Sequence, residues 1–182
     1  VDGLFAVGDD PPGHFMRTAF AAQGLDADLI HTVAAATGAG VGIIQADGEN
    51  RIAVYPGANA SLSVAHVTAR ADRLRNAGLI FAQFEAPDAP IAAAFALARE
   101  AGLTTILNPS PYRAIHRDIL AATDIIIVNE HEAAALAKDL FWTGPNDGLA
   151  ALLAADGVRT LIVTHGRHGA QAWERGTLID QP

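Results

Sequence analysis

Residues 124–132 read DIIIVNEHE, and this stretch decides the fold class. Asp124–Val128 reads as a strand, and its residues Ile125–Val128 are a short apolar run without the polar–apolar alternation of a strand that has one face in water. Runs of this kind are typical of strands covered on both faces in parallel sheets. The polar residues that follow open a helix at Asn129 or Glu130. We therefore expect a strand that leads directly into a helix, the unit from which α/β folds are built.

The same alternation continues on both sides of this stretch. Further strands are expected at 79–83, 104–107, 160–164 and, as the last one, 170–174. Helices are expected at 89–101, 113–121 and 147–156. Strands that alternate with helices predict right-handed βαβ units. The fold class is therefore α/β, with a mostly parallel sheet flanked by helices.

The first third of the chain is loop-rich and follows a different pattern. A short helix is expected at His14–Gln23 and a longer one from Ser63 to about Asn76. Two strand-like segments, 41–45 and 51–55, are joined by residues that contain Asp47-Gly48, a hairpin signal. This hairpin does not fit the alternation, so we expect a small separate sheet that covers a site.

Composition excludes several classes of protein. The chain has 182 residues, which suits one domain or a large part of one. A net charge of −8 argues against a nucleic-acid partner bound through a basic face. Cysteine is absent, which excludes disulfides and a cysteine nucleophile. No run approaches the about 20 apolar residues of a membrane span, and no signal peptide is visible, which fits a cytoplasmic protein. Because the chain begins with Val1, a leader upstream stays open.

Ligands of open parallel sheets bind beyond the carboxyl ends of the strands. Asn129-x-x-Glu132 lies at such an end and has two interpretations. As a capping box, the two side chains satisfy free N–H groups of the helix. As a ligand site, Asn129 contacts a phosphate and Glu132 holds magnesium or its water shell. Both can hold at once.

Three other features at strand ends also have two interpretations. The loop Thr164–Gly169 is either an anion-binding nest or a tight turn that needs glycine. Glu85 either accepts hydrogen bonds from sugar hydroxyls or is a solvated loop carboxylate. His131, His165 and His168 suggest a metal site, but the sequence does not indicate the three or four convergent groups that one needs.

Six segments in collinear order resemble the motifs of one family. They are Val7-Gly8-Asp9-Asp10, the stretch from Thr37-Gly38 through Gly48-Glu49-Asn50 to Gly57-Ala58-Asn59, Gln83–Pro87, Leu107–Pro111, Asn129–Ala133 and Thr164–Gly169. Together they resemble the ribokinase-like (PfkB) family of ATP-dependent sugar kinases. The resemblance implies a Rossmann-like α/β core with a small β lid, here a hairpin at about residues 37–58.

The resemblance also implies an activity and roles for particular residues. The family transfers the γ-phosphoryl group of ATP to a sugar hydroxymethyl group, with ribose as the first choice here. Asn129 would contact the nucleotide phosphates, and Glu132 would organise Mg²⁺ through water. Thr164, Gly166 and Gly169 would line the nucleotide site, and Glu85 would bind the sugar. The resemblance further implies K⁺ as a monovalent cation in the complete protein. A homodimer through the lid would use Ile43, Ile52, Val54 and Tyr55, which alternatively pack the lid on its own domain.

Two family motifs do not occur in this sequence. They are the sugar-binding Gly-Gly-Lys-Gly-Ala-Asn and the Gly-Ala-Gly-Asp that carries the catalytic base. We therefore expect residues 1–182 to be a single incomplete domain with no catalytic residue and no activity in isolation. Fructose, 2-keto-3-deoxygluconate and nucleosides stay open as acceptors. Two other classes also stay open: a non-enzymatic nucleotide-binding or regulatory remnant, and an unrelated α/β binding domain.

Overall fold

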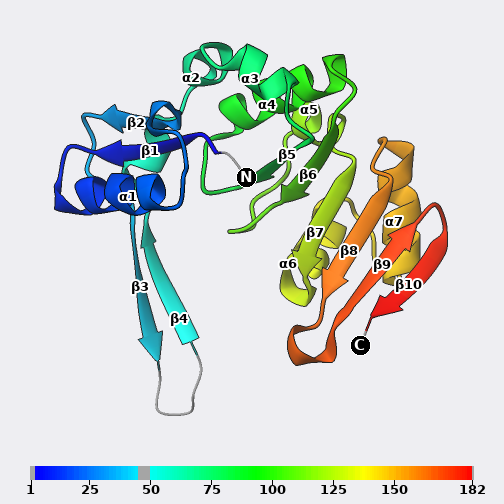
Figure 1. Ribbon diagram of the computed structural model, residues 1–182. Helices are drawn as coiled ribbons and strands as arrows, with labels where there is room; N and C mark the ends of the chain where they lie inside the picture. Colours follow the sequence, from blue (N-terminus) through cyan, green and yellow to red (C-terminus); the bar gives the residue numbers. More distant parts are fainter. Residues whose placement is uncertain (1–2, 45–49, 182) are drawn as a thin grey trace. The chain divides into compact units, whose positions relative to one another are not determined.

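The structure is a computed structural model that describes residues 3–44 and 50–181. Contacts divide the chain into two compact units, Val1–Ser63 with Glu85–Pro87, and Val64–Phe84 with Asp88–Pro182. Each unit has its own strands and helices (Figure 1). Within the described ranges, no helix is long and apolar enough to cross a membrane.

The first unit contains two small sheets (Figure 1). Strands β1 (Phe5–Gly8) and β2 (Ile30–Val33) pair in parallel, and neither was expected from the sequence. Each of these strands has only four residues, which is too short for a recognisable alternation of apolar and polar side chains. Strands β3 (Ala39–Ile44) and β4 (Asn50–Tyr55) pair antiparallel, as the hairpin signal predicted. The predicted Asp47-Gly48 turn lies outside the described residues. Two 3₁₀ turns, η1 (Ala27–Leu29) and η2 (Gly57–Ser61), complete the unit.

One carboxylate organises the start of helix α1 (Pro11–Ala22). Asp10 Oδ1 accepts from the backbone N–H of Gly13 at 2.9 Å and from Thr37 Oγ1 at 2.5 Å. Thr37 N–H donates to Asp10 Oδ2 at 2.8 Å, and Gly8 N–H donates to Thr37 Oγ1 at 2.9 Å. These bonds, led by that from the Thr37 side chain, lower the pKa of Asp10. The helix begins three residues before the expected start at His14, since proline is well accommodated in a first helical turn.

The second unit is built on a six-stranded sheet with the order β10-β9-β8-β7-β6-β5. Its parallel strands are β5 (Leu79–Gln83), β6 (Thr104–Asn108), β7 (Ile125–Asn129) and β8 (Thr160–Thr164). Strands β9 (Ala170–Glu174) and β10 (Thr177–Gln181) follow antiparallel. The expectation of a mostly parallel sheet is confirmed. The expectation that 170–174 is the last strand is wrong, because a two-residue turn at Arg175-Gly176 leads into β10.

The helices of this unit lie where the sequence predicted helices, but some are shorter than expected. Their bounds are α2 Val64–Thr68, α3 Ala71–Arg75, α4 Asp88–Glu100, α5 Arg117–Leu120, α6 Glu130–Asp139 and α7 Asn146–Ala155. The helix expected from Ser63 to Asn76 is two short helices, because the backbone leaves helical geometry at Arg70. The helix expected at 113–121 is only the four residues of α5, capped by the side chain of His116.

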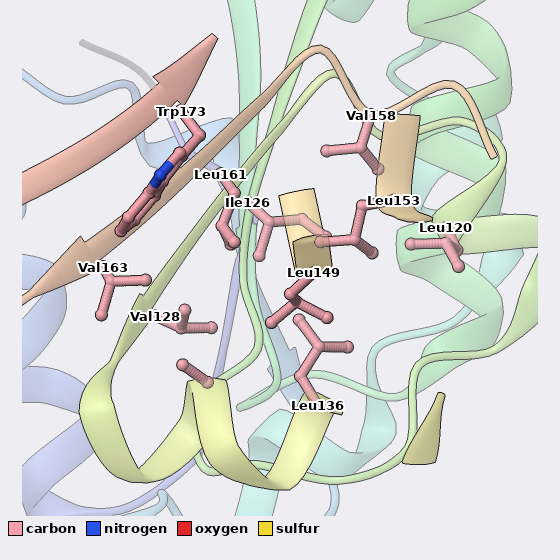
Figure 2. Close-up of a cluster of buried hydrophobic side chains, with 11 residues drawn as sticks. Leu120, Ile126, Val128, Leu136, Leu149, Leu153, Val158, Leu161, Val163 and Trp173 are labelled. Carbon is pink, nitrogen blue, oxygen red and sulfur yellow. The ribbon is translucent and has the colours of Figure 1, made fainter. Parts of the chain in front are cut away.

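Buried side chains of the sheet lie at alternate positions on one face. Ile126 and Val128 of β7 and Leu161 and Val163 of β8 are almost fully buried, whereas Ile125 and Ile127 are only half-buried. The two-sided burial expected for these strands is therefore incomplete. Strands that follow one another in order, joined by right-handed connections, place their connecting helices on the same face. Figure 2 shows the resulting cluster, in which Leu136 of α6 and Leu149 and Leu153 of α7 meet the strand residues.

The end of α6 holds a phenylalanine in a backbone conformation that favours glycine. Phe141 has φ 54° and is 96% exposed. We expect Phe141→Gly to raise the free energy of unfolding by about 0.5–1 kcal/mol, because glycine adopts this conformation without Cβ strain. Phe141→Ala is the control: it removes the ring but keeps Cβ, and should give no gain. Urea denaturation followed by circular dichroism measures both, and equal stability of the two variants would contradict the strain argument.

Candidate functional site

The second unit has an open pocket at the carboxyl ends of its parallel strands. Its volume is about 310 Å³. Polar residues from three neighbouring strand ends line it: Asn108 at the end of β6 with Ser110 just after it, Asn129 at the end of β7 with Glu132 in α6, and Thr164 at the end of β8. The apolar residues Phe81, Ile127 and Val128 complete the lining. This is the edge at which α/β sheets bind ligands.

Asn129 and Glu132 form the predicted capping box. Glu132 N–H donates to Asn129 Oδ1 at 2.9 Å, and Asn129 N–H donates to Glu132 Oε2 at 2.9 Å. These bonds fix both side chains where β7 becomes α6, and Glu132 is only 8% exposed. A carboxylate accepts about four hydrogen bonds, so the cap does not exhaust Glu132. The capping function and a ligand function are compatible at this position.

The residue after the neighbouring strand β8 is joined to this helix by a side-chain hydrogen bond. His165 Nδ1 lies 2.9 Å from Glu130 Oε1. The bond from His165 lowers the pKa of Glu130. The pair joins the first residue of α6 to the residue after β8, and these two residues directly follow Asn129 and Thr164. The sequence suggested His165 only as a candidate metal ligand. Its contact with Glu130 was not predicted because the two residues are 35 positions apart.

The loop after β8 uses glycine for its backbone conformation. It forms the short 3₁₀ turn η3 (Gly166–His168), which ends at Gly169. Gly166 has φ 55°, and Gly169 has φ 86° with ψ −144°, a region that only glycine occupies readily. The lining of the described pocket includes Thr164 but neither glycine. Both glycines lie in the loop that follows β8, the strand that brings Thr164 to the pocket.

A chain of side-chain amides supports the pocket from β5 to β7. Gln83 Nε2 donates to Asn108 Oδ1 at 2.8 Å, and Asn108 Nδ2 donates to the carbonyl oxygen of Ile127 at 2.8 Å. Asn108 and Ser110 lie in a strand-end segment that the sequence indicated, although no role was assigned to either. Phe81 was missed, since nothing in a strand pattern distinguishes a lining residue from a packing residue.

Glu85 is not a lining residue of this pocket. It is exposed in the turn after β5 and belongs to the first compact unit, whereas the pocket belongs to the second. Its predicted contact with a sugar stays a prediction.

The donor set of the pocket fits magnesium held through water. Glu132, Asn129 and Thr164 supply oxygen atoms, which Mg²⁺ prefers, and Mg²⁺ keeps several of its waters. Among residues 3–44 and 50–181, no three His, Asp or Glu side chains come together as a metal cage. One carboxylate beside an open pocket is compatible with Mg²⁺ held through water.

The chain is an α/β protein with an open pocket at the carboxyl ends of its parallel strands. A family model described as pfkB family carbohydrate kinase matches residues 1–180. The chain belongs to the pfkB family of carbohydrate kinases. This excludes the unrelated α/β binding domain that the sequence left open.

Individual relatives agree with this assignment. The chain is 34% identical over 166 residues to a ribokinase of Staphylococcus aureus, covering 90% of this chain and 54% of that protein. It is 33% identical over 175 residues to a ribokinase of Schizosaccharomyces pombe, covering 93% and 55%. A solved structure of Arabidopsis thaliana ribokinase with ribose and ATP has the same fold, with a TM-score of 0.84 at 24% identity, covering 99% of this chain and 60% of that one. The chain thus spans about half the length of the curated relatives it matches.

Proposed function

We propose that the natural polypeptide containing these residues transfers the γ-phosphoryl group of ATP to a hydroxymethyl group of a sugar, with ribose as the first substrate. The observation that carries the proposal is the pocket in which Asn129, Glu132 and Thr164 come together from two neighbouring strand ends. The relatives named ribokinase support ribose as the sugar. The bound ribose and ATP of the Arabidopsis protein support both ligands.

Each predicted residue has a defined role in this proposal. Asn129 contacts the nucleotide phosphates, and Thr164 and the glycine loop after β8 line the nucleotide site. Glu132 holds Mg²⁺ through water, and the metal would neutralise charge on the phosphates. Glu85 binds the sugar. The complete protein also uses a monovalent cation such as K⁺.

We further propose that the complete protein forms a homodimer through the hairpin. Ile43, Ile52, Val54 and Tyr55 of β3 and β4 are 52, 70, 51 and 56% exposed. Exposed apolar side chains gathered on two strands are typical of a contact surface. Sedimentation equilibrium of the natural polypeptide tests this, and a monomer at micromolar concentration would contradict it.

Comparing acceptors in the natural polypeptide tests the proposed reaction. We expect ATP-dependent phosphorylation of ribose with a kcat/KM at least about tenfold above that for fructose, 2-keto-3-deoxygluconate or a nucleoside, since a pocket whose polar groups match one sugar leaves some of them unpaired with another. Residues 1–182 alone should give no turnover, because the motif with the catalytic base is not among them. Nucleotide binding by the natural polypeptide without transfer to any acceptor would instead favour a non-enzymatic role.

A further inference from the structure

One guanidinium holds both ends of the short loop that carries Glu85. This loop, Glu85–Pro87, is called the Glu85 loop; it follows Phe84 and leads into α4 at Asp88. Arg113 Nη1 donates to the carbonyl oxygen of Phe84 at 2.6 Å. The Nη2 and Nε atoms of Arg113 donate to Asp88 Oδ1 at 2.7 and 3.0 Å. A single side chain therefore joins the residue before the loop to the residue after it.

Phe84 is held more firmly than a loop residue usually is. Its backbone N–H donates to the carbonyl oxygen of Ser110 at 3.1 Å. Its ring is 3% exposed and lies under Arg113, with Cζ 4.0 Å from the ring centroid. The N–H, the carbonyl and the ring of Phe84 are thus all engaged. Because Ser110 lines the pocket, the first end of the Glu85 loop is tied to the segment that forms the pocket wall.

The chemistry of this cluster requires arginine. A guanidinium is planar, always charged and has five N–H donors, so it can stack on a ring while it bonds in two directions. The side chains of Arg113 and Asp88 are 37% and 40% exposed. Ion pairs with this much exposure contribute little to the free energy of folding. The more informative property of the cluster is therefore the geometry that it imposes on the chain.

We propose that Arg113 is a positioning residue that fixes the conformation of the Glu85 loop and thereby sets the affinity for the sugar. A loop of three residues with both ends fixed has few conformations available. The inference rests on the proposed function, in which Glu85 binds the sugar. Neither the sequence motifs nor the pocket assigned a role to Arg113, since it lies outside both.

The test compares four variants of the natural polypeptide with ribose and ATP as substrates. Arg113→Ala should raise the KM for ribose about tenfold, the effect of losing one charged hydrogen bond, with the KM for ATP unchanged. Arg113→Lys should recover only part of this, because lysine cannot stack and bond in both directions. Glu85→Gln is the reference for direct loss of the sugar contact. The double variant of Glu85→Gln and Arg113→Ala should be no worse than Glu85→Gln alone if Arg113 acts through Glu85.

Arg159→Ala is the matched control. The Arg159 side chain is 46% exposed and donates to Asp124 Oδ1 at 3.0 Å. This pair lies at the amino end of β7, away from the pocket, so its loss should leave the KM for ribose unchanged. Hydrogen exchange of residues 84–88 gives a readout independent of activity: Arg113→Ala should accelerate it, and Arg159→Ala should not.

The outcomes distinguish a failure of the proposed function from a failure of the role proposed for Arg113. If the natural polypeptide phosphorylates no sugar, the proposed function is wrong, and exchange of residues 84–88 still reports whether Arg113 fixes the loop. If Glu85→Gln raises the KM for ribose but Arg113→Ala does not, the proposed function stands and the role of Arg113 is wrong. Effects that add fully in the double variant would also overturn the inference.

Discussion

Glu132→Gln should lower kcat of the natural polypeptide by about 100-fold while its melting temperature stays unchanged. The magnitude is that of losing a group that supports a metal through its ligands. Glutamine keeps the shape of the side chain and an oxygen that accepts from Asn129 N–H, so the capping box survives. What it loses is the negative charge. The variant therefore separates the capping function of Glu132 from a function in holding magnesium, and steady-state kinetics with thermal unfolding measures both.

Glu130→Gln is the control for this substitution. Glu130 lies on the same first turn of α6, but its side chain is 67% exposed and pairs with His165 outside the pocket lining. It loses the same charge two residues away, so a general effect of charge near α6 would appear in both variants. We expect kcat of Glu130→Gln to stay within about twofold of the parent, since the effects of exposed pairs are small. If Glu132→Gln kept full kcat, Glu132 would be a helix cap and nothing more.

The pocket around Glu132 was predictable because local and global signals agree there. The apolar run before Asn129 indicated a parallel strand, and the ligand rule for such sheets indicated its carboxyl end. The Asn129-x-x-Glu132 spacing indicated a capped helix start, and the structure has that cap. Both signals lie within about ten consecutive residues, so both can be recognised from the sequence without knowing the tertiary structure.

The features that escaped prediction depend on pairing between distant segments. Strand β1 pairs with β2 across the whole of α1, and four residues in each leave no period to detect. The bond between Glu130 and His165 exists because β7 and β8 are neighbours in the sheet. Arg113 reaches Phe84 and Asp88 for a similar reason, since β5 and β6 are adjacent. The role of Glu85 is not decided by either kind of signal and stays a prediction.

The second large expected effect is a loss of stability when the buried hydrophobic cluster of the second unit is disrupted. Leu153→Ala should lower the free energy of unfolding by about 2–5 kcal/mol, the usual cost of emptying a fully packed leucine site. Leu153 of α7 is 0% exposed and belongs to the cluster in Figure 2. Val128 and Val163, which directly precede Asn129 and Thr164, belong to the same cluster. The packing that Leu153 completes therefore also supports the two strands that present the site.

Leu152→Ala provides the comparison within the same turn of helix. Leu152 is 38% exposed, so its truncation removes less buried area and leaves no enclosed cavity. We expect a loss of about 1 kcal/mol or less, partly offset by the higher helix propensity of alanine. Urea denaturation followed by circular dichroism gives both values on the same baseline. Equal losses for the two leucines would mean that α7 does not pack on β8 through the face that carries Leu149 and Leu153. The cluster would then not support the strand ends that form the pocket.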